Sequence, residues 1–316
     1  MSKRVEEVLD KIPILKYIVR FLKSIKLPGL EGLSIYDLLE LYTVGIVEGT
    51  LTTRASAIAF NFFTAIFPFL LFVIIIIPNI TIPGFQEDFL SFLDSILPPQ
   101  TSEFFNQNIF ENINKNRGAG LVSSVFVLSL FLMANGVNSV FTSFETSYHD
   151  VLTRNLFRQY LYALGVSLIL VLLLILTVAV SGYVQIYILA PIYDAAFHED
   201  INQSGLGWIQ ALKYLFYVIM VYIATATLYY FGTREGKHTR FFSVGALLTT
   251  ILIIITSYFF GVYIESFSKY NELYGSIGAL LILLLYLWLN SNILLLGYEL
   301  NVTLRVLHQQ HQTSNE

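Results

Sequence analysis

The amino-acid sequence predicts an all-α integral membrane protein: a bundle of six transmembrane helices, with amphipathic interfacial helices at the N-terminus and in the first outer loop. Two observations predict this class. Hydrophobic residues make up 55% of the 316 and charged residues only 13%, which is about half the usual charged fraction of a globular protein. The apolar residues also gather in runs of roughly the 20 residues that a helix needs to cross a bilayer. The membrane is therefore the expected solvent.

The N-terminal part, residues 1–54, precedes the first long apolar run. Residues 1–30 set apolar positions against basic ones with helical spacing, which is typical of an amphipathic helix on an anionic membrane surface. A solvated helix packed on the cytoplasmic ends of the bundle explains the same pattern. A loop containing Pro and Gly follows, and a second amphipathic segment over 34–51 leads into the membrane.

Six apolar runs follow within a transmembrane domain that covers residues 55–301. They lie at about 55–77, 119–141, 161–186, 212–231, 242–264 and 277–297. The outer loop between the first two, 79–118, carries apolar residues with helical spacing on both sides of Pro98 and Pro99. We expect two amphipathic helices there, which either lie in the membrane interface or cap the mouth of the bundle.

The distribution of basic residues predicts the orientation. With the N-terminus in the cytoplasm, 14 of the 18 lysines and arginines fall in cytoplasmic segments and 3 in the outer loops. Such an excess of positive charge marks the cytoplasmic side of membrane proteins. Both termini, including a tail at 302–316, are therefore expected in the cytoplasm.

Polar residues inside the apolar runs are few, and they are the candidates for function because hydrocarbon offers them no water. The candidates for a polar cavity or substrate path are five asparagines: Asn61, Asn135, Asn138, Asn290 and Asn292. All five fall in the predicted inner half of the bundle. They either form hydrogen bonds that hold the helices together or line a polar cavity open to the cytoplasm.

Three further residues are singled out around these spans. Arg54 stands at the cytoplasmic start of the first span and Glu299 at the cytoplasmic end of the sixth, so the two are candidates for an ion pair at the inner surface. Pro68 lacks a backbone N–H and is expected to kink the first helix. The kink leaves a carbonyl exposed, which serves either substrate binding or only the shape of the helix.

The composition disfavours several classes of function. No acidic or basic residue occupies the middle of a predicted span, which disfavours coupling through a buried carboxylate. The sequence has no cysteine, no GxxxxGK[ST], HExxH or GxSxG motif, and a net charge of only −4. We therefore expect no enzyme activity, catalytic residue, metal site, cofactor or nucleic-acid partner. We expect membrane lipids as partners, and the pattern does not indicate an oligomeric state.

Two motifs carry a resemblance to a known family. The stretch 54–68 reads RASAIAFNFFTAIFP and resembles the R-A-x-A-[LI]-A-F signature, ending in F-P, of the YihY/virulence factor BrkB family. The stretch 272–301 reads ELYGSIGALLILLLYLWLNSNILLLGYELN and resembles that family's closing pattern, Y-G-S-[LI]-G followed by L-L-G-x-E-[LI]-N. The resemblance covers about residues 40–305 and implies a six-helix protein of the bacterial cytoplasmic (inner) membrane. Family members have carried the label ribonuclease BN, but this sequence lacks the clustered acidic metal ligands or basic groove that a nuclease needs.

Three functions are compatible with these observations. The first is a transporter or permease of unknown substrate, with the polar cluster lining its path. The second is an envelope phospholipid-handling protein, acting in lipid translocation or transfer, whose interfacial helices admit lipid from the bilayer. The third is a non-transporting envelope scaffold. The sequence favours the transporter.

Overall fold

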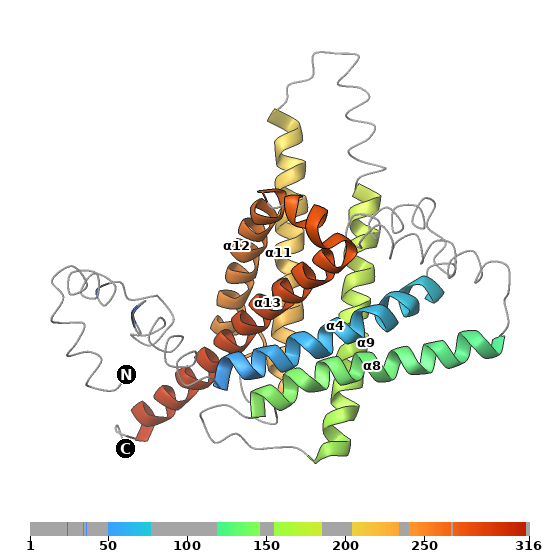
Figure 1. Cartoon of the computed structure of the whole chain (residues 1–316). Coiled ribbons are helices and arrows are strands. Elements are labelled where there is room, and N and C mark those ends of the chain that lie inside the picture. The colour runs from blue at the N-terminus through green and yellow to red at the C-terminus, as the bar shows by residue number, and fades with distance from the viewer. Residues whose placement is uncertain are drawn as a thin grey trace.

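The structure is a computed structural model of the whole chain. It describes residues 50–76, 119–145, 155–184, 204–233, 240–266 and 268–313, together with Ser24, Ser34 and Tyr36. Six helices occupy these ranges (Figure 1): α4 (Thr50–Ile76), α8 (Ala119–Glu145), α9 (Leu156–Tyr183), α11 (Ser204–Gly232), α12 (Val244–Ser266) and α13 (Ser268–Thr313). The predicted all-α fold is therefore confirmed for the described ranges. The predicted outer helices at 79–118 lie outside them, as do the N-terminal amphipathic helices apart from single positions.

Five of the described helices are long and apolar enough to cross a membrane. Their apolar segments are Val127–Glu145 of α8, Leu156–Tyr183 of α9, Ala211–Gly232 of α11, Val244–Tyr263 of α12 and Leu280–Val306 of α13. The sequence predicts a sixth span at 55–77, where α4 forms a helix of 27 residues that continues through Pro68. The side chains of α4 are described from Leu51 to Ile66, so that of Pro68 lies outside the described part.

Several helices extend beyond the ends of the predicted spans. α9 begins at Leu156 instead of 161, and α11 begins at Ser204 instead of 212. α13 has 46 residues, or about 69 Å at 1.5 Å per residue, which exceeds the roughly 30 Å thickness of a bilayer's hydrocarbon core. Much of the predicted tail is therefore helical. An apolar run shows where a helix can lie in lipid, whereas backbone hydrogen bonding continues into the polar residues on either side.

The six helices pack in a closed ring. Along the ring, α4 packs against α8, α8 against α9, α9 against α11, α11 against α12, α12 against α13, and α13 back against α4. Figure 1 shows α4 and α8 running side by side across α9. The contact between α4 and α13 makes neighbours of two helices from distant parts of the sequence.

The buried core gathers toward one end of these helices. Phe144, near the end of α8, stacks on Tyr298 of α13 with ring centroids 4.1 Å apart. Tyr229, near the end of α11, also meets Phe144 in an edge-to-face arrangement, with ring centroids 5.7 Å apart. Leu51 and Ala55, from the start of α4, belong to the same cluster. If successive helices alternate in direction across the membrane, all these ends lie on the side that the basic residues predict to be cytoplasmic. We call this region the packed end.

Candidate functional site

A chain of hydrogen bonds links α4, α8 and α9 through two of the predicted asparagines. Asn135 Nδ2 donates to Asn61 Oδ1 at 3.3 Å, and Asn61 Nδ2 donates to Ser139 Oγ at 3.0 Å. Tyr160 of α9 donates its hydroxyl proton to Asn135 Oδ1 at 3.0 Å. We call these four residues the polar network. Hydrogen bonds between helices in a membrane are worth about 0.6–2 kcal/mol each, so the network helps to hold three helices together.

Sequence reasoning does not single out two members of the polar network. Ser139 lies four residues after Asn135 on the same face of α8, so helical spacing is a signal that points to it. Tyr160 has no such signal, because it precedes the predicted third span at 161–186. The earlier start of α9, at Leu156, makes Tyr160 part of the helix that packs against α8.

Asn138 takes no part in the polar network, although it lies between two of its members in the sequence. Its side-chain oxygen Oδ1 is buried and accepts no hydrogen bond from the residues that the structure describes. The hydroxyl of Thr142 donates at 3.0 Å to the backbone carbonyl of Asn138, not to its side chain. A buried acceptor without a donor costs about 1–3 kcal/mol, so hydrogen bonding among the described helices does not explain this asparagine.

Asn290 and Asn292 bond to their own helix. Asn290 Nδ2 donates to the carbonyl of Tyr286 and Asn292 Nδ2 to the carbonyl of Trp288, each at 2.8 Å. Asn290 Oδ1 is buried and, within the described helices, accepts no hydrogen bond. In that part of the chain no hydrogen bond joins Asn290 or Asn292 to the polar network. Hydrogen bonds thus bring together two of the five predicted asparagines.

Arg54 and Glu299 form a buried ion pair. Arg54 Nη2 donates to Glu299 Oε1 at 2.8 Å and so joins the start of α4 to α13. The two side chains are only 10% and 3% exposed, so both lie inside the packed end and not on an open surface. A buried pair adds little net stability, but breaking it is costly because the remaining charge stays buried. Among the described residues, no three His, Asp or Glu side chains gather in a way that would hold a metal ion.

α12 and α13 approach each other backbone to backbone at Gly245 and Gly297. A Cβ atom on Gly297 would overlap the hydroxyl oxygen of Thr249, and a Cβ atom on Gly245 would overlap the carbonyl oxygen of Gly297. Small residues permit close helix packing in membranes, and here only the absence of a Cβ leaves enough room.

Tyr229 of α11 completes this junction. Its hydroxyl donates to the Leu294 carbonyl at 2.7 Å and lies 2.6 Å from Thr249 Oγ1. Because a tyrosine hydroxyl has one proton, Thr249 is the donor in the second bond. One buried hydroxyl therefore links α11 to both α12 and α13.

Asn301 of α13 caps the start of α12. Its Oδ1 accepts the backbone N–H of Gly245 at 2.8 Å, and its Nδ2 donates to Ser243 Oγ at 2.9 Å. Ser243 Oγ in turn accepts the N–H of Ala246 at 3.2 Å. The first N–H groups of a helix have no partner within it, so the two side chains satisfy groups that would otherwise be left unbonded.

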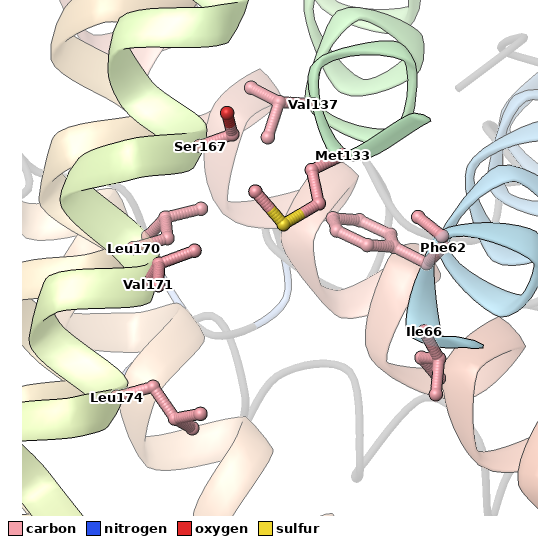
Figure 2. A pocket seen from close by; sticks show the side chains of 9 residues that line it. Phe62, Ile66, Met133, Val137, Ser167, Leu170, Val171 and Leu174 are labelled. Atoms are coloured by element: carbon pink, nitrogen blue, oxygen red, sulfur yellow. The ribbon is translucent and has the colours of Figure 1, made fainter. Parts of the chain in front are cut away.

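A cavity of about 240 Å³ lies between α4, α8 and α9 (Figure 2). Its lining residues are Phe62, Ala65, Ile66, Met133, Val137, Ser167, Leu170, Val171 and Leu174. Only Ser167 is polar, and its hydroxyl donates to the Leu164 carbonyl of its own helix at 2.8 Å. Figure 2 shows Met133 reaching into the space between Phe62 and α9. None of the five predicted asparagines lines this cavity, so it is an apolar site distinct from the polar network.

Comparison with known proteins assigns the family. The family model described as virulence factor BrkB matches residues 44–316. This chain belongs to the virulence factor BrkB family. A putative ribonuclease-like protein YfkH of Bacillus subtilis (strain 168) is 24% identical over 270 residues, which cover 84% of this chain and 92% of that protein. A UPF0761 membrane protein of Aggregatibacter aphrophilus (strain NJ8700) is 24% identical over 260 residues, 81% of this chain and 88% of that protein. No solved structure matches the chain significantly.

The two motifs of this BrkB-family chain meet at the packed end. Arg54, which opens the first motif, pairs with Glu299 of the closing motif. Two further residues in the last part of that closing pattern also have physical roles: Gly297 permits the close approach of α12, and Asn301 caps that helix. The spacing of Gly297, Glu299 and Asn301 thus serves contacts with two different helices, α4 and α12.

Proposed function

We propose that this BrkB-family protein is a phospholipid-handling transporter of the bacterial cytoplasmic membrane that binds and moves a lipid-like substrate without enzymatic chemistry. The observation that supports the proposal best is the apolar cavity between α4, α8 and α9. Its walls are hydrocarbon and a thioether, apart from the Ser167 hydroxyl, which already bonds to its own helix. A polar solute would lose its water there without gaining hydrogen bonds, whereas an acyl chain has none to lose.

The size of the cavity also favours an acyl chain. Its volume of about 240 Å³ is below the roughly 300–1,000 Å³ typical of pockets that enclose a whole small molecule. One chain, or part of a larger molecule, fits. Two exposed apolar residues lie close in the sequence to residues that line the cavity. Leu172 directly follows a lining residue and is 65% exposed, and Phe131 is two residues from Met133 and is 57% exposed. A chain therefore has apolar surface along which to enter from the surrounding lipid.

The proposed orientation has both termini in the cytoplasm. The excess of lysine and arginine in the segments assigned to that side supports it. The chain has no cysteine, so two variants can be made that each contain one thiol. The first has a cysteine at position 316 and the second has a cysteine at position 204. A membrane-impermeant thiol reagent added to intact spheroplasts is expected to label the second and spare the first. The reverse pattern would overturn the orientation.

A lipid-movement assay tests the function. The purified protein is reconstituted in vesicles that carry a trace of NBD-labelled phospholipid in both leaflets, and dithionite is added outside. We expect the wild type to make inner-leaflet label accessible, so that less than half of the fluorescence survives. Leu174→Trp, which fills the cavity, is expected to slow this loss. Leu176→Trp, on an exposed position of the same helix outside the cavity lining, is its matched control and is expected to leave the rate unchanged. Wild-type vesicles that behave like protein-free vesicles would refute the proposal.

A permease for a polar solute is the second candidate. Two buried acceptors favour it, Oδ1 of Asn138 and Oδ1 of Asn290, which have no hydrogen-bond donor in the described helices. Water or a passing solute would supply one. Single cysteines at these two positions are expected to react with an aqueous thiol reagent if they line a path, whereas a cysteine at the fully buried Leu295 serves as the unreactive control. Protection of both asparagine positions would count against a polar path.

A further inference from the structure

A second hollow lies between α9 and α11. It has a volume of about 480 Å³ and is lined by Arg158, Leu161, Tyr162, Gly165, Val166, Ile169 and Phe231. It shares no lining residue with the cavity between α4, α8 and α9. We call it the α9–α11 groove. It is therefore a separate feature of the surface and not an extension of the cavity.

The groove has a cationic end and an apolar length. Arg158 lies in the first turn of α9, and Phe231 in the last turn of α11, so both stand at the packed end of the bundle. Arg158, Leu161, Gly165 and Ile169 are all exposed and recur every three or four residues, which places them on one stripe of α9. At about 1.5 Å per residue the stripe extends about 16 Å from Arg158.

The described part of the chain covers neither Arg158, at one end of the stripe, nor Gly165, in its middle. The guanidinium of Arg158 has no ion-pair or hydrogen-bond partner among the described residues, and its side chain is exposed. A Cβ atom on Gly165 would meet nothing within 4 Å. A charged group at one end and an open apolar channel beside it form a surface that matches an amphiphile.

We propose that the α9–α11 groove binds an anionic phospholipid, with its phosphate on Arg158 and an acyl chain along Leu161, Gly165 and Ile169. A guanidinium presents paired N–H donors that match two phosphate oxygens. The apolar stripe takes the chain, and the surrounding bilayer supplies such lipids at high concentration. The site goes beyond the proposed function, because a lipid can bind there whether or not the protein moves lipid through the membrane.

Charge complementarity selects this occupant over the others. An apolar helix, from a second copy or from another protein, would leave the Arg158 guanidinium against an uncharged surface. Phosphatidylcholine carries its own cation beside the phosphate, so it gains less from Arg158 than phosphatidylglycerol does. Free inorganic phosphate would engage Arg158 and leave the apolar stripe empty.

Native mass spectrometry of the full chain in detergent tests the site. The protein is titrated with phosphatidylglycerol and with phosphatidylcholine of the same acyl chains. We expect the wild type to bind phosphatidylglycerol about tenfold more tightly, as one charge-assisted contact allows. Arg158→Gln is expected to remove this preference, whereas Arg240→Gln, at an exposed arginine outside the groove, keeps it. Equal preference in the wild type and Arg158→Gln would overturn the site, as would displacement of the bound lipid by millimolar inorganic phosphate.

A second pair of variants tests the apolar length. Gly165→Leu fills the groove and is expected to weaken binding of both lipids by about tenfold, since it removes the burial of several methylene groups. Gly261→Leu is the matched control, because Gly261 is an exposed helical glycine of α12 whose added Cβ also meets nothing within 4 Å. Equal binding by the two variants would overturn the assignment of the chain to this stripe.

A chemical block covers the case in which Gly165→Leu does not fold. Leu161→Cys introduces the only thiol of the chain, and a bulky maleimide is attached after folding and purification. Full modification is expected to lower phosphatidylglycerol binding by about tenfold, and unchanged binding would overturn the site. These measurements record binding in micelles, so failure of lipid movement in vesicles leaves their outcome unaffected.

Discussion

Arg54 and Glu299 are 245 positions apart in the sequence, yet Arg54 Nη2 lies 2.8 Å from Glu299 Oε1 inside the helix bundle. The pair joins α4 to α13, the contact that closes the ring of six helices. If the pair breaks, water cannot stabilise either charge, because both side chains are almost fully shielded from solvent. The ion pair therefore joins the first and the last of the six described helices.

Breaking this ion pair is expected to destabilise the protein strongly. Glu299→Gln or Arg54→Gln leaves one buried charge without its partner, at a cost of about 3–5 kcal/mol in the free energy of unfolding. The double exchange, Arg54→Glu with Glu299→Arg, is expected to recover part of this loss. Thermal unfolding in detergent micelles measures both effects. If the exchanged protein is no more stable than Arg54→Glu alone or Glu299→Arg alone, the pairing does not carry the coupling between α4 and α13.

A methyl group at Gly297 is expected to separate α12 from α13. In Gly297→Ala the new Cβ overlaps Thr249 Oγ1 and crowds the Tyr229 hydroxyl, and overpacking of this kind costs about 1–3 kcal/mol. Gly261→Ala is the control. Its Cβ meets no atom within 4 Å, so the higher helix propensity of alanine is expected to leave stability unchanged or raised by up to about 1 kcal/mol. Equal melting temperatures for the two variants would contradict the close approach.

The two asparagines of α8 are expected to respond in opposite ways to the same substitution. Asn135→Leu removes the amide that bonds to Asn61 and Tyr160, at a cost of about 1–3 kcal/mol because partners are left unbonded. Asn138→Leu removes a buried acceptor that has no donor among the described residues, so stability is expected to stay constant or rise. Chemical unfolding in mixed micelles compares them. Equal losses would show that Asn138 has a partner in the folded protein.

Asn301 and Ser243, which cap α12, are expected to be coupled in their contributions to stability. Asn301→Ala removes the acceptor for the Gly245 N–H, and Ser243→Ala removes the acceptor for the Ala246 N–H. Each is expected to cost about 0.5–2 kcal/mol, as for other helix N-caps. Because Asn301 Nδ2 also bonds to Ser243 Oγ, the double variant is expected to lose less than the two single losses combined. Strict additivity in a double-mutant cycle would contradict the link between the two side chains.

Much of the helix content of the fold was predictable from the sequence, because a long apolar run that lies in lipid must be helical. Hydrocarbon leaves no water for backbone groups, so each long apolar run must satisfy them within a helix. The ends were less predictable. Leu156 and Ser204 start α9 and α11 ahead of the apolar runs, since a helix does not stop where its side chains become polar. Tyr160 entered the polar network through such an extension.

The candidate site was predictable in its residue types and not in their partners. Asn61 and Asn135 stand out in apolar surroundings, and hydrogen bonds between α4 and α8 join them. Asn290 and Asn292 stand out equally, yet their amides bond within α13. An asparagine amide away from water can bond either to a neighbouring helix or to its own helix, and its position in the sequence does not show which of the two it does. The apolar cavity had no sequence signal, because Phe62, Met133 and Val171 resemble any other residues of an apolar run.

By itself, the sequence determined that this protein is helical, that its apolar runs belong in a membrane, and which few polar residues require an explanation there. Those conclusions follow from composition and from spacing along one helix, which are local properties of the chain. Only the tertiary structure decided which polar groups meet, that Gly245 and Gly297 touch, and that hollows lie between α4, α8 and α9 and between α9 and α11. The reason is that contacts and cavities depend on how each helix is rotated against its neighbours, and Arg54 facing Glu299 is a product of that rotation.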